Sequence, residues 1–271
     1  MNQKKLKLNI ALLSSLAMAS LAQADPWADS VVSYNSGVGP ALGYTDPAVA
    51  LGEPTHQSIA FGGYPVTPFS AAGGVTEVVS LGEGGELTIR FNEPVTDDQN
   101  NPFGVDLLIF GNSFFNLGSF NNDHTDLATG STASEGGVVS LSADGINFFV
   151  VSGVDADGRF PTLGFSDIAI PFPATASIPT DFTQPVDPSF DVTGLNTAAI
   201  VAGYNGSGGG VGIDLATVGL TQITHVKITN PVGSGLTPEI DGFADVRAIP
   251  EPATFALVGL ALVGGGLWRR K

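Results

Sequence analysis

The 271-residue chain contains no cysteine. This absence excludes catalysis by a thiol, disulfide cross-links and zinc sites built on thiolates. Stability must therefore come from an ordinary hydrophobic core, with a bound cation as a further means of cross-linking. A hydrophobic content of 43% is enough to build such a core and argues against a disordered chain.

Basic residues are scarce between positions 25 and 249. This span has 25 acidic residues and four basic ones, which gives a formal net charge of −21. The four are Arg90, Arg159, Lys227 and Arg247. Such a negative surface repels phosphate backbones, so we expect no nucleic-acid partner, and it favours solubility and cation binding.

Long amphipathic helices are also missing, because no window away from the two ends has a 3.6-residue apolar period. Residues 86–91 and 224–228 alternate polar and apolar side chains with period two, whereas residues 104–111 are almost continuously apolar. Further strands are expected near 75–81, 198–202 and 240–248. With 36 glycines and 18 prolines between short strands, residues 25–248 are predicted to form one all-β domain, an antiparallel β-sandwich of jelly-roll type.

Residues 138–151 give the clearest hairpin signal. Asp144-Gly145 lies between two β-rich runs, and this pair favours the positive φ angles of a tight type I′ turn. Residues 160–190 contain six prolines, too many for central strands, and are expected to form loops.

The N-terminus has the three parts of a secretory signal peptide. Lys4, Lys5 and Lys7 precede an apolar stretch, which ends in Ala22-Gln23-Ala24. We predict that residues 1–24 are removed as a signal helix. The mature chain then begins at Asp25.

The C-terminus also has three parts. The first is Pro250-Glu251-Pro252, and the second is an apolar run over residues 253–268, predicted to be a transmembrane helix. Its 16 residues would span about 24 Å, somewhat less than a bilayer core of about 30 Å. The third part, Arg269-Arg270-Lys271, would remain in the cytoplasm under the positive-inside rule. A buried core helix would not explain this basic end.

This pattern over residues 249–271 resembles the PEP-CTERM sorting signal of Gram-negative bacteria that produce exopolysaccharide, with Ile249 where members often have valine. The resemblance implies that a membrane-embedded exosortase reads Pro250-Glu251-Pro252. It also implies that the protein is held briefly in the inner membrane and then passes to the cell surface or extracellular matrix.

The core is similar to galactose-binding-like β-sandwich domains of secreted surface proteins. The stretches that carry this resemblance are residues 44–55, 101–112, 139–148, 185–195, 206–215 and 239–246. The resemblance implies a jelly roll with a possible structural calcium and supplies no activity.

Three acidic residues are the predicted calcium ligands. Glu239 and Asp241 are two apart in a strand and so are expected to share a face. Asp106 interrupts an apolar strand, where a carboxylate is costly unless it is paired or bound to metal. An ion pair between Asp106 and Arg90 or Arg247 is the alternative.

No catalytic motif is present, and the three histidines lack metal-ligand spacing. The sequence therefore predicts a non-catalytic surface or matrix protein associated with exopolysaccharide. A secreted carbohydrate-binding module is the first alternative, and a glycan hydrolase, which needs only two suitably placed carboxylates, is the second. The aromatic residues that could stack on sugar are Trp27, Tyr64, Phe114, Phe115 and Tyr204.

Overall fold

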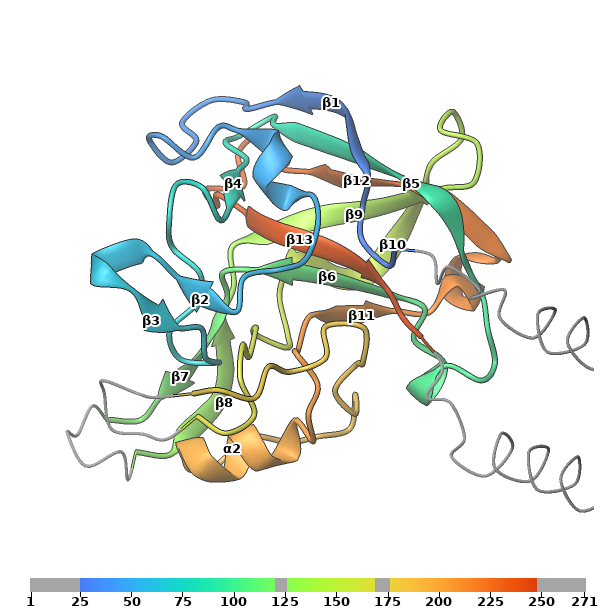
Figure 1. Cartoon of the computed structure of the whole chain (residues 1–271). Helices are drawn as coiled ribbons and strands as arrows, with labels where there is room; N and C mark the ends of the chain where they lie inside the picture. Colours follow the sequence, from blue (N-terminus) through green and yellow to red (C-terminus); the bar gives the residue numbers. More distant parts are fainter. Residues whose placement is uncertain (1–24, 120–125, 169–175, 248–271) are drawn as a thin grey trace, which may run out of the picture.

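The structure is a computed structural model that describes residues 25–119, 126–168 and 176–247 (Figure 1). The predicted signal peptide and the sorting tail, with its expected transmembrane helix, lie outside these residues. Within the described ranges, no helix has the length and apolar character needed to cross a bilayer.

The larger sheet has five antiparallel strands in the order β1-β5-β12-β9-β10. Their bounds are β1 Ser30–Asn35, β5 Glu86–Thr96, β12 Gln222–Thr229, β9 Gly136–Ser142 and β10 Phe149–Asp157. The alternating residues 86–91 and 224–228 thus lie in neighbouring strands, as period two predicts for a sheet with one buried face. In β12 the inward side chains Ile223, Val226 and Ile228 have no exposed surface.

The second sheet has four antiparallel strands in the order β11-β6-β13-β4. They are β11 Val211–Ile213, β6 Leu107–Gly111, β13 Glu239–Asp245 and β4 Val79–Ser80. Its inner side chains pack with those of the larger sheet in one hydrophobic cluster, so the two sheets face each other as in a sandwich (Figure 1). The all-β class is confirmed, and the jelly-roll type stays a prediction.

A third layer covers the outer face of the smaller sheet (Figure 1). Leu108 and Phe110 of β6 point away from the main core and pack with Phe182 and Val246. This cover explains why the whole of β6 is buried and why its sequence is continuously apolar. The layer also includes the described parts of the predicted proline-rich loops, residues 160–168 and 176–190, which contain no regular strand.

Small elements complete the described chain. Two further two-stranded sheets pair β2 Gln57–Ser58 with β3 Tyr64–Pro65, and β7 Phe114–Leu117 with β8 Ala128–Ala133. The one α-helix of the described residues is α2, Thr197–Gly203, and the 3₁₀ turns are η1 Pro47–Ala50, η2 Ala60–Gly62, η3 Pro102–Gly104 and η4 Leu215–Val218. A second hydrophobic cluster joins Ile200 of α2 to Phe115, Phe160 and Tyr204.

Two local predictions are wrong. Residues 198–202 are helical instead of extended, because the Asn196 side chain caps the helix by accepting a bond from the Ala199 amide at 2.9 Å. The hairpin of β9 and β10 exists, but Phe149 pairs with Leu141, so the connection is longer than a two-residue turn. Gly145 has a positive φ, whereas Asp144 does not and instead accepts bonds from the amides of Ile146 and Asn147.

Candidate functional site

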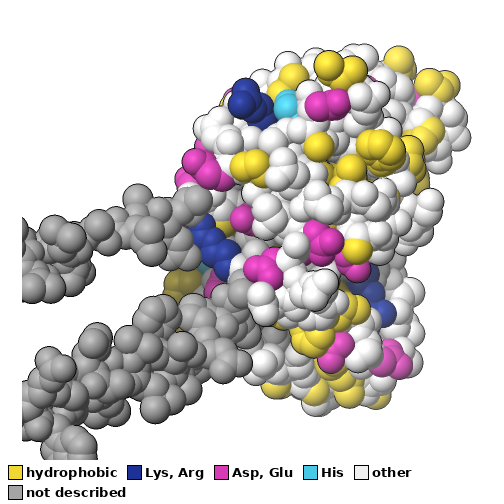
Figure 2. Space-filling model, turned by 90° about the vertical axis from the view of Figure 1, so that its right-hand side faces the viewer, with side chains coloured by type: hydrophobic (Ala, Val, Ile, Leu, Met, Phe, Trp, Pro, Cys, Tyr) yellow, Lys and Arg dark blue, Asp and Glu magenta, His cyan; other side chains and the backbone are white. Residues whose placement is uncertain are grey.

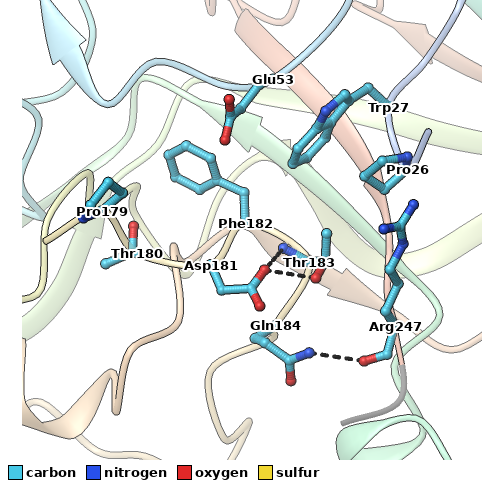
Figure 3. A pocket seen from close by; sticks show the side chains of 10 residues that line it. All are labelled: Pro26, Trp27, Glu53, Pro179, Thr180, Asp181, Phe182, Thr183, Gln184 and Arg247. Carbon is cyan, nitrogen blue, oxygen red and sulfur yellow. Dashed lines mark hydrogen bonds between the residues drawn. The ribbon is translucent and has the colours of Figure 1, made fainter. Parts of the chain in front are cut away.

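One cavity of the described structure has a volume of about 510 Å³ and opens beside the third layer (Figure 3). It is assembled from the segment before β1, the loop before β2, the loop 179–184 and the end of β13. The residues that line it are Pro26, Trp27, Glu53, Pro179, Thr180, Asp181, Phe182, Thr183, Gln184 and Arg247.

Strand β13 of the smaller sheet holds Trp27 in place. Trp27 forms an isolated antiparallel bridge with Ala244 of β13, and the amide of Asp245 donates to the Pro26 carbonyl oxygen at 2.8 Å. The indole is only partly buried and packs against the cluster that contains Phe182. One side of the indole is thus supported by the core, while Figure 3 shows the ring at the cavity.

Phe182 and Asp181 come from one short loop segment. Phe182 is 1% exposed and lies edge-on to Phe110, with ring centroids 5.1 Å apart, so it forms a rigid floor. Oδ1 of Asp181 accepts bonds from the amide and the hydroxyl of Thr183 at 2.8 and 2.7 Å. These two bonds fix the carboxylate and leave its second oxygen without a protein donor in the described chain.

Glu53 lies across the cavity from Asp181 (Figure 3). Its Oε1 is 3.1 Å from Nε2 of His56, and Nδ1 of that ring is 2.7 Å from the Gly164 carbonyl oxygen. Both partners are acceptors, so the imidazole can donate to both only in its charged form. The centroids of the His56 and Phe182 rings are 4.3 Å apart, so His56 contacts both Glu53 and the aromatic floor of the cavity.

Polar groups complete the opposite rim. The Gln184 side-chain amide donates to the Arg247 carbonyl oxygen at 2.9 Å, which holds the end of β13 against the loop. The cavity therefore combines aromatic surface, two carboxylates, an amide and a guanidinium. Aromatic faces bind the apolar faces of sugar rings, and carboxylates and amides bind hydroxyl groups, so this mixture suits a glycan.

Basic side chains form no continuous patch on the face seen in Figure 2, where lysine and arginine occur in small separate groups among acidic and apolar residues. Within the described residues Lys227 pairs with Glu86 at 3.5 Å, which uses part of this scarce positive charge. The surface thus agrees with the expectation of no nucleic-acid partner, which stays a prediction.

The structure separates the three predicted calcium ligands. β13 runs antiparallel to β6, with Asp245 opposite Leu107 and Ile240 opposite Gly111. Asp106 therefore lies at one end of this strand pair and Glu239 at the other. A register shift between Ile240 and Gly242 also interrupts the two-residue alternation on which the shared face was predicted. These residues do not form one site.

Asp106 is fully buried and acts as a hydrogen-bond acceptor for the loops around it. Its Oδ1 accepts from the Asp98 amide and the Asn101 side chain at 3.1 and 3.0 Å, and Oδ2 accepts from the Leu215 amide at 3.0 Å. Neither arginine of the predicted ion pair is among these donors. Burial raises the pKa of this carboxyl group, although the three bonds oppose the rise.

Two other aspartates lie beside Asp106. One carboxylate oxygen from each of Asp97, Asp106 and Asp214 falls within 4.8 Å of the others. Asp214 also caps η4, since its Oδ1 accepts from the Ala216 amide at 2.8 Å. Asp106 and Asp214 thus lie close together because both accept hydrogen bonds from backbone amides of the neighbouring turns.

Asp241 is buried and bound to Thr55. The Thr55 amide and hydroxyl donate to its two oxygens at 2.9 and 2.8 Å. Burial raises the pKa of the Asp241 carboxyl group to about 7. Its role in the described structure is to join β13 to the segment before β2.

Of the aromatic residues named as sugar-stacking candidates, Trp27 alone lines this cavity. Phe115 and Tyr204 are 2% and 1% exposed and belong to the second hydrophobic cluster, so they cannot stack on a ligand. The Tyr64 hydroxyl donates to the Ala71 carbonyl oxygen, and Phe114 is exposed elsewhere. Glu53, Asp181 and Phe182 were not predicted, because nothing in the sequence shows that their loops meet.

Comparison with known proteins identifies one segment. Residues 248–271 match the family model described as the PEP-CTERM protein-sorting motif. A search of curated proteins finds no match to the chain. The motif defines a class, the exported bacterial proteins that an exosortase processes and that are sorted to the cell surface. The present chain carries this motif directly after Arg247, at the rim of the cavity.

Proposed function

We propose that this protein is a non-catalytic component of the cell surface or extracellular matrix, and that its cavity binds exopolysaccharide. The observation that carries the proposal is the position of Trp27, a partly exposed indole supported by the core and faced by polar side chains. An exported protein at a surface rich in polysaccharide meets such ligands at high local concentration.

The rest of the proposal follows from the two ends of the chain. The signal peptide directs export, the tail holds the protein in the inner membrane of a Gram-negative cell, and exosortase releases it. The β-sandwich is proposed to be of the galactose-binding-like jelly-roll type, which the two facing antiparallel sheets support.

A glycan hydrolase is the second candidate, because Glu53 and Asp181 both line the cavity. A hydrolase needs a carboxylic acid whose pKa is raised toward neutrality. The carboxyl groups with such values, including Asp241 and Glu239, are not among the lining residues. This distribution favours binding over hydrolysis.

A glycan array and a pull-down with exopolysaccharide from the producing cells test the proposal. We expect retention of the purified protein on at least one acidic or neutral polysaccharide, with no shortening of the polymer. Release of reducing ends would support the hydrolase instead, and failure to bind any glycan would contradict both.

A further inference from the structure

A second cavity adjoins the one that contains Trp27. It has a volume of about 320 Å³ and lies between η3, the loop 184–187 and the residues at and after the end of α2. Gln184 lines both cavities. Its side-chain amide donates to the Arg247 carbonyl oxygen beside the first cavity, and its own carbonyl oxygen accepts a bond at 2.6 Å from the hydroxyl of Ser207, which lines the second. The two cavities therefore share a wall.

Phe103 gives the second cavity an aromatic surface. This residue is 57% exposed and belongs to none of the hydrophobic clusters of the described chain. Core packing therefore does not explain a phenylalanine at this position. Its ring offers an apolar face to the second cavity, as the Trp27 indole does to the first, and such faces suit the apolar side of a sugar ring.

The turn that carries Phe103 is tied to the core. Asp106, which is fully buried, accepts a bond from the Asn101 side chain at 3.0 Å, and the Asn101 carbonyl oxygen accepts one from the Gly104 amide at 3.2 Å. Phe103 lies within this turn and has a φ of 60°, in the left-handed region that bulky residues seldom adopt. The turn thus holds the backbone of Phe103 in one conformation despite its cost, so the aromatic surface is preorganised for a ligand.

Polar side chains of the second cavity resemble those of the first. Oδ1 of Asp187 accepts bonds from the hydroxyl and the amide of Ser189 at 2.7 and 2.8 Å, as Asp181 does from Thr183. These bonds lower the pKa of the Asp187 carboxyl group and leave its Oδ2 without a protein donor in the described chain. The exposed Asn205 side chain also lines the cavity and has no hydrogen bond within the described residues. Its amide and the free oxygen of Asp187 are therefore available to sugar hydroxyl groups.

We propose that the two cavities form one elongated site that binds consecutive sugar units of a single glycan chain, with one unit on Trp27 and another on Phe103. This inference rests on the proposed function and adds the class of ligand, which is a polymer instead of a free monosaccharide. Each cavity has the volume of a separate small-molecule site. Because both are lined by Gln184, a chain that crosses this residue passes from one cavity to the other. Two stacking contacts on one chain strengthen binding without a tight contact at either place.

Fragments of exopolysaccharide from the producing cells, made by partial acid hydrolysis and separated by length, test this site. Calorimetric titration of the full-length protein should show an affinity that rises with fragment length. Phe103→Ala should weaken binding of the longest fragments about tenfold, because one of two stacking surfaces is lost, and should change binding of single sugars far less. Asn205→Gly keeps a residue suited to a positive φ but removes the amide, so it should weaken binding of the longest fragments about threefold.

Phe61→Ala is the matched control. Phe61 is also an exposed phenylalanine with a left-handed φ, of 51°, but it lines neither cavity. This variant should bind every fragment like the parent, and all three variants should melt close to the parent because the replaced side chains are exposed.

Three results would overturn the inference and leave the proposed function standing. In the first, the parent binds the polymer and Phe103→Ala binds it equally well. In the second, Phe103→Ala loses affinity to the same degree at every fragment length. In the third, Phe61→Ala weakens binding as much as Phe103→Ala. Absence of binding by the parent to any fragment would contradict both the inference and the proposed function.

Discussion

Trp27 pairs with Ala244 of β13, so the first residues of the predicted mature chain and the last residues before the sorting motif lie side by side. The same arrangement places Pro26, Trp27 and Arg247 around one cavity. A ligand in this cavity would therefore contact the point at which the chain enters its tail.

Replacement of Trp27 tests the role of the cavity. Trp27→Ala should weaken glycan binding about tenfold, because the aromatic surface that stacks on a sugar ring is lost, and a tenfold loss corresponds to about 1.4 kcal/mol. The protein should stay folded, since the indole is only partly buried. Phe114→Ala, which removes an exposed aromatic ring elsewhere, is the control, and equal binding by both variants would contradict the assignment.

Glu77 should be a major determinant of stability. Its carboxylate accepts bonds from the Ser58 hydroxyl and the amides of Ile59, Gly73 and Gly74. In Glu77→Gln an amide NH₂ would face these donors, so the free energy of unfolding should fall by about 1–3 kcal/mol. Urea unfolding measures this change, and Glu93→Gln, at an exposed position, should have little effect.

The same carboxylate should make stability sensitive to acid. Burial alone would raise the pKa of Glu77, but the four hydrogen bonds lower it below its usual value. A lowered pKa in the folded state stabilises the protein above the pKa of the unfolded chain, and this contribution is lost as pH falls through the lower value. Glu77→Gln should therefore lose less stability than the parent between pH 7 and pH 3. A parallel loss in both proteins would contradict this account.

Gly111 should not tolerate a side chain. In Gly111→Ala the new methyl group would meet Oδ1 of Asp157 and the Glu239 carbonyl oxygen, both of which are held in the interior. We expect destabilisation of about 1–3 kcal/mol, as for other overpacked cores. At Gly118 the nearest atom would be 3.6 Å away, so Gly118→Ala is the control for loss of glycine itself. Equal melting temperatures for both variants would contradict the packing.

Sorting should depend on the tail without affecting the folded domain. The hydrophobic clusters of the described chain end at Val246, before the motif. Glu251→Ala should therefore leave the unprocessed protein in the membrane fraction while its melting temperature stays unchanged. Immunoblots of cell fractions check this result. Normal release of the variant would show that the exosortase does not recognise Glu251.

The sequence predicts the strands well where one physical signal dominates. β5 and β12 alternate because each has one buried face, and β6 is continuously apolar because the third layer covers its second face. The short helix α2 was missed because Ala198–Ala202 is apolar without a period, although Asn196 was a possible cap signal.

The sites were less predictable because they depend on register and on loops. The prediction that Glu239 and Asp241 share one face of a strand assumed regular alternation. The register shift between Ile240 and Gly242 of β13 interrupts that alternation. Asp157 is the last residue of β10, and nothing near it in the sequence indicates that its carboxylate lies beside Gly111 together with the Glu239 carbonyl oxygen. Trp27, Glu53 and Asp181 likewise come from three segments that only the tertiary fold brings together.

The intact mass of the protein recovered from outside the producing cells tests the central claim most directly. The account predicts a chain that begins at Asp25, because the signal is removed, and that lacks the apolar segment 253–268 and the basic end, because exosortase has processed the tail. Recovery of the full 271-residue chain, or its retention inside the cell, would contradict the account.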